Sequence, residues 1–175
     1  MSGHNKWSKI KRQKEKTDGQ KSKLFGKLVR MISVEAKKSQ GNTSALGLKT
    51  AIEKAREANV PNENIERAIK RAHELGDNLE AITYEAYGPG GCAIIIETLT
   101  TNRNKAAQEI KHILSNHSIA LAGIGSATWA FEKTNNEWVP QNTVPLNDED
   151  LTLLETIVDE LEENDEVQEV YTNAE

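Results

Sequence analysis

Cysteine is nearly absent from this chain: among its 175 residues, Cys92 is the only one. A single thiol excludes an intramolecular disulfide and, without companion cysteines, a zinc site built from thiolates. No apolar run approaches the roughly 20 residues of a membrane-spanning helix, and the first residues lack the apolar core of a secretion signal. These absences predict a soluble, cytoplasmic protein without a membrane partner.

Signatures of catalysis are missing as well. No serine lies in a GxSxG elbow, no HExxH motif occurs, and His4, His73, His112 and His117 have no cysteine-bearing partner set. The Gly88–Gly91 segment (GPGG) lacks the Lys-Ser/Thr that follows a phosphate-binding loop, so it is interpreted as a hairpin turn. We therefore expect no enzyme activity, no metal or organic cofactor, and no small-molecule substrate.

Charge, in contrast, is abundant and sorted by position. Residues 1–80 hold 18 of the 22 Lys/Arg and 10 Asp/Glu, whereas residues 81–175 hold 4 and 17. A phosphate backbone responds to the local field rather than to the net charge of −5. The basic half is therefore predicted to bind nucleic acid.

The acidic end has several interpretations. Residues 147–175 contain 12 Asp/Glu and no Lys or Arg. A solvated helix face is the plainest interpretation. The others are repulsion that keeps nucleic acid on the basic half, and masking of the basic region when no ligand is bound. The sequence leaves these alternatives open.

Hydrophobic periodicity predicts a helical domain over residues 21–78, preceded by a basic arm over residues 1–20. From Lys6 to Gln20 the arm has almost no apolar periodicity and carries only Trp7 and Ile10 as large apolar residues. We therefore expect the arm to gain structure from a partner. Within the domain, three segments show helical spacing: residues 21–38, 46–58 and 62–72, the last with Asn62 as its cap.

The pattern changes after Asp77 to strands interleaved with two helices. A hairpin is predicted from residues 82–87 and 92–99, and a linker from residues 76–80. Residues 79–175 thus predict a two-layer α/β domain with a mostly antiparallel sheet, and the whole chain an α+β fold. The later elements expected are helix 103–115, strand 127–131, strand 138–139, helix 151–161 and strand 167–171.

Nucleic-acid contacts are expected from cations of the arm and of the first helix. Trp7 is expected to stack on an exposed base or ribose, the alternative being that it packs on the helical domain. Lys23, Lys27 and Arg30 recur at about one turn and share a helix face. The predicted contact residues are Lys6, Trp7, Lys9, Lys11, Arg12, Lys14, Lys16, Lys21, Lys23, Lys27 and Arg30.

A secondary contact with a phosphate or a partner is expected at Arg103 and Asn104, which open a predicted helix. Simple capping of that helix by Thr101 or Asn102 explains the same residues, and both interpretations remain open. No predicted helix carries a cluster of base-reading side chains, so recognition of a defined DNA sequence is not expected from these patterns.

Five segments resemble landmarks of the YebC family of probable transcriptional regulators, which includes the mitochondrial translational activator of cytochrome c oxidase. They occur in the family's order and span nearly the whole chain. The landmarks are Gly3–Lys11 (GHNKWSKIK), Asn64–Ile69 (NIERAI), Tyr84–Gly91 (YEAYGPGG), Thr101–Asn104 (TNRN) and Val167–Asn173 (VQEVYTN).

The resemblance also points to a missing part. Family members usually carry a third domain inserted in the second, after a strand like Trp129–Lys133 (WAFEK). Here only Thr134–Glu137 separates Lys133 from Trp138, so this chain is interpreted as a short form without the insertion.

The resemblance implies a nonenzymatic, nucleic-acid-binding regulator of gene expression. The leading expectation is transcriptional control through DNA bound by the basic N-terminal region. One alternative is a ribosome-associated translation factor that binds ribosomal RNA, and another is a protein-interaction adaptor that uses the acidic C-terminal domain. The expected partners are DNA or ribosomal RNA, with the transcription machinery or the ribosome.

Overall fold

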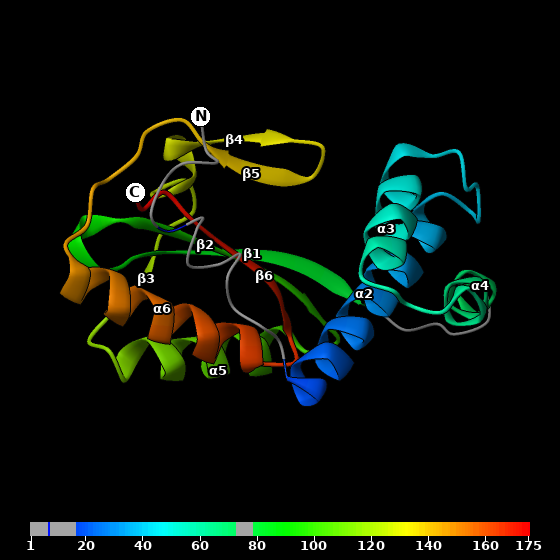
Figure 1. Ribbon diagram of the computed structural model, residues 1–175, viewed down its shortest axis with the longest axis horizontal. Coiled ribbons are helices and arrows are strands. Elements are labelled where there is room, and N and C mark those ends of the chain that lie inside the picture. The colour runs from blue at the N-terminus through cyan, green and yellow to red at the C-terminus, as the bar shows by residue number, and fades with distance from the viewer. Residues whose placement is uncertain (1–6, 8–16, 73–78) are drawn as a thin grey trace. The chain divides into compact units, whose positions relative to one another are not determined.

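The computed structural model describes residues 7, 17–72 and 79–175, and these form two compact units (Figure 1). One unit is built from three helices, and the other from a β-sheet with two long helices. The unit boundary falls between Leu79 and Glu80, within the predicted linker. The predicted α+β fold is confirmed.

The helical unit consists of α2 (Asp18–Lys38), α3 (Leu46–Glu57) and α4 (Asn62–Arg71). Helix α2 begins three residues before the predicted start because Thr17 and Gln20 form a capping box. The Thr17 hydroxyl accepts from the Gln20 N–H at 3.3 Å, and the Gln20 side chain accepts from the Thr17 N–H at 2.9 Å. This box satisfies two backbone donors that the first turn leaves unpaired.

The core of the helical unit is narrow because many of its buried residues are alanine. Ile32, Leu48 and Ile65 supply the larger side chains, while alanines on all three helices allow close packing. The predicted cap at Asn62 is wrong. Pro61 occupies the cap position and accepts the N–H groups of the first turn, which makes Asn62 the first helical residue.

The α/β unit is organised around the predicted hairpin. Strands β1 (Glu80–Tyr87) and β2 (Ala93–Thr100) pair over their full length, from Glu80 opposite Thr100 to Tyr87 opposite Ala93. The short 3-10 turn η2 (Pro89–Gly91) joins them, with Gly90 and Gly91 at φ 64° and 79°. Glycine adopts such angles at little steric cost, as a GPGG turn requires.

An antiparallel four-stranded sheet with order β3-β1-β2-β6 extends this hairpin, adding β3 (Leu121–Ala122) and β6 (Val167–Thr172). Helices α5 (Arg103–Ser115) and α6 (Asp148–Glu163) lie side by side along one face, as Figure 1 shows. Ile94 and Ile96 point into that core, whereas Ala93 and Ile95 point to the opposite face.

The opposite sheet face is also covered, which adds a layer to the predicted two. A 3-10 turn, η3 (Thr128–Ala130), and the hairpin of β4 (Phe131–Thr134) and β5 (Glu137–Pro140) pack there. Asn135 and Asn136 turn this hairpin with φ values of 52° and 64°, an arrangement typical of a two-residue hairpin loop. This turn occupies the point at which the family's inserted domain was expected.

The strand predicted at residues 127–131 is wrong for all but Phe131. The Glu85 carboxylate, only 4% exposed, accepts the N–H groups of Gly125, Ala127 and Thr128 at 2.7, 2.7 and 3.0 Å. These donors converge on one buried side chain rather than on a neighbouring strand. Glu85 therefore folds the segment into a loop and the turn η3.

Trp7 lies in the main core of the α/β unit. Its side chain is 8% exposed and belongs to the same cluster of buried residues as Ile94, Ile110 and Leu154. Neither the predicted stacking on nucleic acid nor packing on the helical domain agrees with this position. Trp7, which precedes the helical unit in the sequence, thus contributes to the core of the α/β unit.

Replacing Trp7 with alanine should lower the unfolding free energy of the α/β unit by about 3 kcal/mol, because a large buried side chain is lost. Residues 17–72 contain no tryptophan, so fluorescence of the remaining indoles during urea unfolding follows the α/β unit. Trp129→Ala is the matched control, since that indole is 63% exposed. Equal losses in the two variants would contradict the core assignment.

Glu85→Gln should destabilise the same unit by about 2 kcal/mol, because the amide replaces an acceptor with a donor and leaves a backbone N–H unpaired. Urea unfolding followed by tryptophan fluorescence measures this loss. Glu132→Gln, at an exposed position of β4, is the control. A Glu85 variant as stable as the Glu132 variant would show that the loop does not depend on the carboxylate.

Candidate nucleic-acid interface

One face of α2 carries a row of cations, Lys23, Lys27 and Arg30, which we call the α2 edge. The buried side chains of α2, Leu28 and Ile32 among them, occupy the opposite side of the helix. Lys23 is exposed, while Lys27 and Arg30 are half-buried. All three take part in interactions within the chain.

The other predicted contact residues are not gathered at this edge. Lys21 is exposed at the start of α2, on a different side of the helix. Trp7 is buried in the other unit and presents no ring face for stacking. The cations Lys6, Lys9, Lys11, Arg12, Lys14 and Lys16 lie outside the described residues.

Further cations on α3 and α4 were not among the predicted contacts. They occur singly or, at Lys70 and Arg71, as one pair, so a search for dense basic runs passes over them although the total charge is large. Residues 17–72 hold 12 Lys/Arg and 6 Asp/Glu. The additional cations are Lys49, Lys54, Arg56, Arg67, Lys70 and Arg71.

Ion pairs neutralise part of this charge. Lys38 lies 2.9 Å from Glu35, Arg67 lies 2.6 Å from Glu63, and Lys49 lies 4.0 Å from Glu53. Such solvated pairs contribute only about 0–1 kcal/mol each, so they also exchange partners readily. The unit keeps a surplus of cations at its surface.

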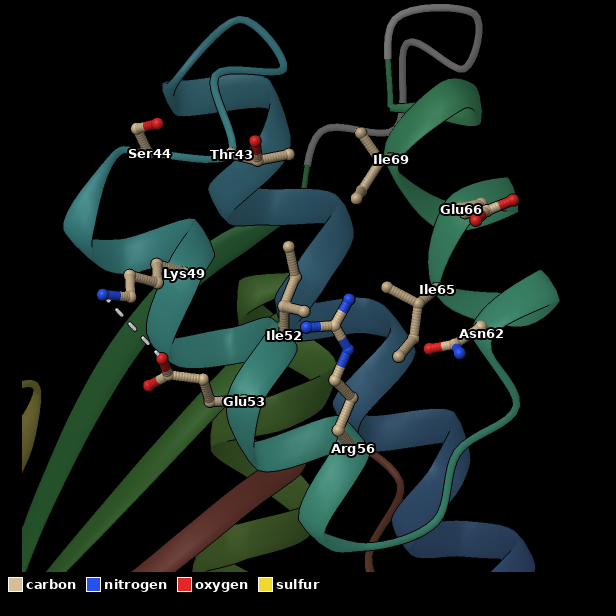
Figure 2. A pocket seen from close by; sticks show the side chains of 10 residues that line it. All are labelled: Thr43, Ser44, Lys49, Ile52, Glu53, Arg56, Asn62, Ile65, Glu66 and Ile69. Carbon is tan, nitrogen blue, oxygen red and sulfur yellow. Dashed lines mark ion pairs between the residues drawn. The ribbon is translucent and has the colours of Figure 1, made fainter.

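A groove of about 540 Å³ opens between α3, α4 and the loop before α3 (Figure 2). Ile52, Ile65 and Ile69 form its apolar floor, and Arg56 extends between the two helices. The groove is lined by Thr43, Ser44, Lys49, Ile52, Glu53, Arg56, Asn62, Ile65, Glu66 and Ile69.

The groove's charged groups are arranged unevenly. Lys49 and Glu53 form their ion pair on the α3 side, and Figure 2 shows the Glu66 carboxylate directed away from Arg56. Across the described residues, the Arg56 guanidinium has no hydrogen bond or ion pair. Asn62, the first residue of α4, also lines the groove. Two different helices and a loop supply the lining, so linear patterns did not predict this groove.

The predicted secondary site at the start of α5 is already engaged. The Arg103 guanidinium donates to both Glu80 carboxylate oxygens, and this contact lowers the pKa of Glu80 and raises that of Arg103. The Asn102 side chain accepts from the Lys105 N–H at 3.1 Å, which is the predicted capping alternative. Asn104 is exposed.

An exposed aromatic ledge marks the α/β unit. The Trp129 indole N–H donates to the Tyr87 hydroxyl at 3.0 Å, and that hydroxyl donates to the Ser126 carbonyl oxygen. Ile124, in the same loop, is fully exposed. Because Glu85 holds this loop, the ledge is a pre-formed apolar surface.

Other kinds of site receive no support from residues 7, 17–72 and 79–175. No group of three His, Cys, Asp or Glu side chains in these ranges is placed to hold a metal ion. None of the helices described there is long and apolar enough to cross a membrane. Burial raises the pKa of the Cys92 thiol, which disfavours the reactive thiolate.

Two family profiles match the chain. The TACO1/YebC protein N-terminal domain matches residues 5–75, and the TACO1/YebC second and third domain matches residues 79–136 and 132–174. The two parts of the second match overlap over residues 132–136, in β4 and the β4–β5 turn.

Curated relatives are named probable transcriptional regulatory proteins. One from Pseudothermotoga lettingae is 49% identical over 157 residues, covering 88% of this chain and 62% of its own length. One from Thermoanaerobacter pseudethanolicus is 38% identical over 240 aligned residues, covering all of this chain and 97% of its own length. The chain thus spans less than two thirds of the first relative. The longer alignment must pass over residues of the second relative that have no counterpart here.

A crystal structure of a conserved hypothetical protein from Aquifex aeolicus has the same fold. The TM-score is 0.83 at 30% sequence identity, and the match covers 98% of this chain and 97% of the other. The profiles, the curated relatives and this structure agree with the landmarks in the sequence. The chain therefore belongs to the TACO1/YebC family.

Proposed function

We propose that this protein is a nonenzymatic regulator of gene expression that binds DNA through its basic N-terminal region. The main support is the separation of charge along the described parts of the chain. Residues 17–72 hold 12 Lys/Arg and 6 Asp/Glu, whereas residues 80–175 hold 4 and 18. Nucleic acid is attracted to residues 17–72 and repelled by residues 80–175. The relatives' name, probable transcriptional regulatory protein, agrees with this role.

The binding mode proposed is contact with the phosphate backbone. The α2 edge and the arm cations Lys9, Lys11, Arg12 and Lys14 supply the positive charge. Backbone contacts position a protein on a duplex but carry no sequence information directly. Target choice then depends on nucleic-acid shape or on a second partner.

Two other functions remain as alternatives. Backbone contacts do not distinguish DNA from RNA, so a ribosome-associated role in translation uses the same cations. A protein-interaction adaptor is favoured by the aromatic ledge of Tyr87 and Trp129, because exposed aromatic side chains on a fixed loop are typical anchors of protein interfaces.

Neutralising Lys9, Lys11, Arg12 and Lys14 together to glutamine should weaken binding to a short DNA duplex. It should also reduce the slope of log affinity against log salt by roughly 3.6, because four phosphate contacts are lost. Fluorescence anisotropy at several salt concentrations measures both. Substitution is preferable to deleting residues 1–20, since deletion also removes the buried Trp7 and the Thr17 cap of α2.

The matched control neutralises the four Lys/Arg of residues 80–175, Arg103, Lys105, Lys111 and Lys133. It removes the same charge from the whole protein, but we expect the salt slope to stay unchanged. An arm variant that binds as tightly as this control would refute phosphate binding by the arm. Ribosome association that survives DNase but not high salt would favour the translation alternative.

A further inference from the structure

The groove between α3 and α4 places the Arg56 side chain beside isoleucines of the helical core. We propose that it binds one unpaired nucleotide, with the base on the isoleucine floor and the phosphate at Arg56. This inference rests on the nucleic-acid binding proposed above and specifies which feature of the nucleic acid the helical unit recognises. The groove geometry, rather than the charge of the arm, carries it.

The size of the groove suits a single nucleotide. Pockets for small organic ligands enclose about 300–1,000 Å³, and this groove encloses about 540 Å³. A nucleotide places one flat, apolar face and one anion into such a volume. A peptide helix, in contrast, needs a longer channel with anchors on successive turns.

The floor provides the apolar surface that a base requires. Ile65 is 3% exposed and Ile52 is also buried, while Ile69 is half-buried beside them. Figure 2 shows these three side chains directed toward the space between the helices. Ile69 is the most exposed of the three, so a base laid on the floor removes mainly the apolar surface of Ile69 from water, which favours binding without selecting a particular base.

Arg56 provides the anion-binding group. Lys49, the other cation of the groove, is paired with Glu53, whereas across the described part of the chain Arg56 has no such partner. A guanidinium binds phosphate with two parallel hydrogen bonds. Helix α4 begins at Asn62 on the same groove, so the positive end of its dipole adds to the attraction.

The remaining polar groups suit the edges of a base or a ribose. Asn62 has both donors and acceptors, and the Thr43 and Ser44 hydroxyls can rotate to serve as either. Repulsion from carboxylates is limited, because Glu53 is paired and the Glu66 carboxylate points away from Arg56. The set is therefore more consistent with an anion attached to a hydrogen-bonding ring than with a cation.

The test compares Arg56→Gln with Arg71→Gln in the full chain. Both arginines are exposed and lie in the last turns of neighbouring helices, but Arg71 does not line the groove. The probes are a short duplex and the same duplex with one bulged nucleotide, each made in DNA and in RNA. We expect Arg56→Gln to weaken the bulged probes about tenfold and the paired probes by less than about twofold. Arg71→Gln should affect paired and bulged probes alike.

A second variant, Ile69→Asn, removes part of the apolar floor at a half-buried position and should weaken the bulged probes selectively. The unchanged circular dichroism spectrum of each variant serves as the folding control. Comparison of the DNA and RNA bulges shows whether the groove prefers a deoxyribonucleotide or a ribonucleotide.

Equal weakening of paired and bulged probes by Arg56→Gln would overturn this inference and leave general nucleic-acid binding intact. An acidic peptide serves as a further probe. If Arg56→Gln weakens binding of this peptide and of no nucleic-acid probe, the nucleotide inference is overturned and the groove is assigned to a protein partner. Wild-type protein that binds none of the probes would refute the proposed function itself.

Discussion

Repulsion between like charges is the constraint on which this architecture depends. The helical unit holds 12 Lys/Arg and 6 Asp/Glu within residues 17–72, and repulsion among these cations opposes its folding. Here the cations lie on the sides of three helices that face away from a narrow, alanine-rich core. Glutamates one turn away offset part of the repulsion through exchangeable ion pairs. The carboxylate surplus is confined to a second unit with its own larger core, which preserves the field of the first.

Elements specified by local signals could be predicted from the sequence. Helix α5 has the predicted bounds because the Asn102 cap and the apolar spacing lie within the same stretch of chain. The β1–β2 hairpin was predicted because alternating residues flank a glycine-rich turn. The α2 edge followed from helical spacing alone. In each case the residues that determine the structure are neighbours in sequence.

Features that need a distant partner were missed or predicted wrongly. Residues 127–131 have strand-like composition, but Glu85, some 40 residues earlier, takes up their N–H groups. Trp7 is surrounded by cations in sequence, yet its partners are strands and helices of the other unit. The groove exists because α3 and α4 lie together, so Arg56 and Ile65 belong to no common linear motif. Hydrophobic periodicity does not reveal contacts between residues that are far apart in the sequence.

The turn between β4 and β5 has a consequence for protein engineering. Thr134 and Glu137 face each other across the hairpin, so the chain leaves and returns at adjacent points. A foreign module spliced between Asn135 and Asn136 would start and finish at almost the same place. Its ends would not pull β4 and β5 apart. The four-stranded sheet contains neither of these strands, so the insertion would not interrupt it. The turn is therefore a suitable insertion site for a fluorescent reporter or an affinity tag.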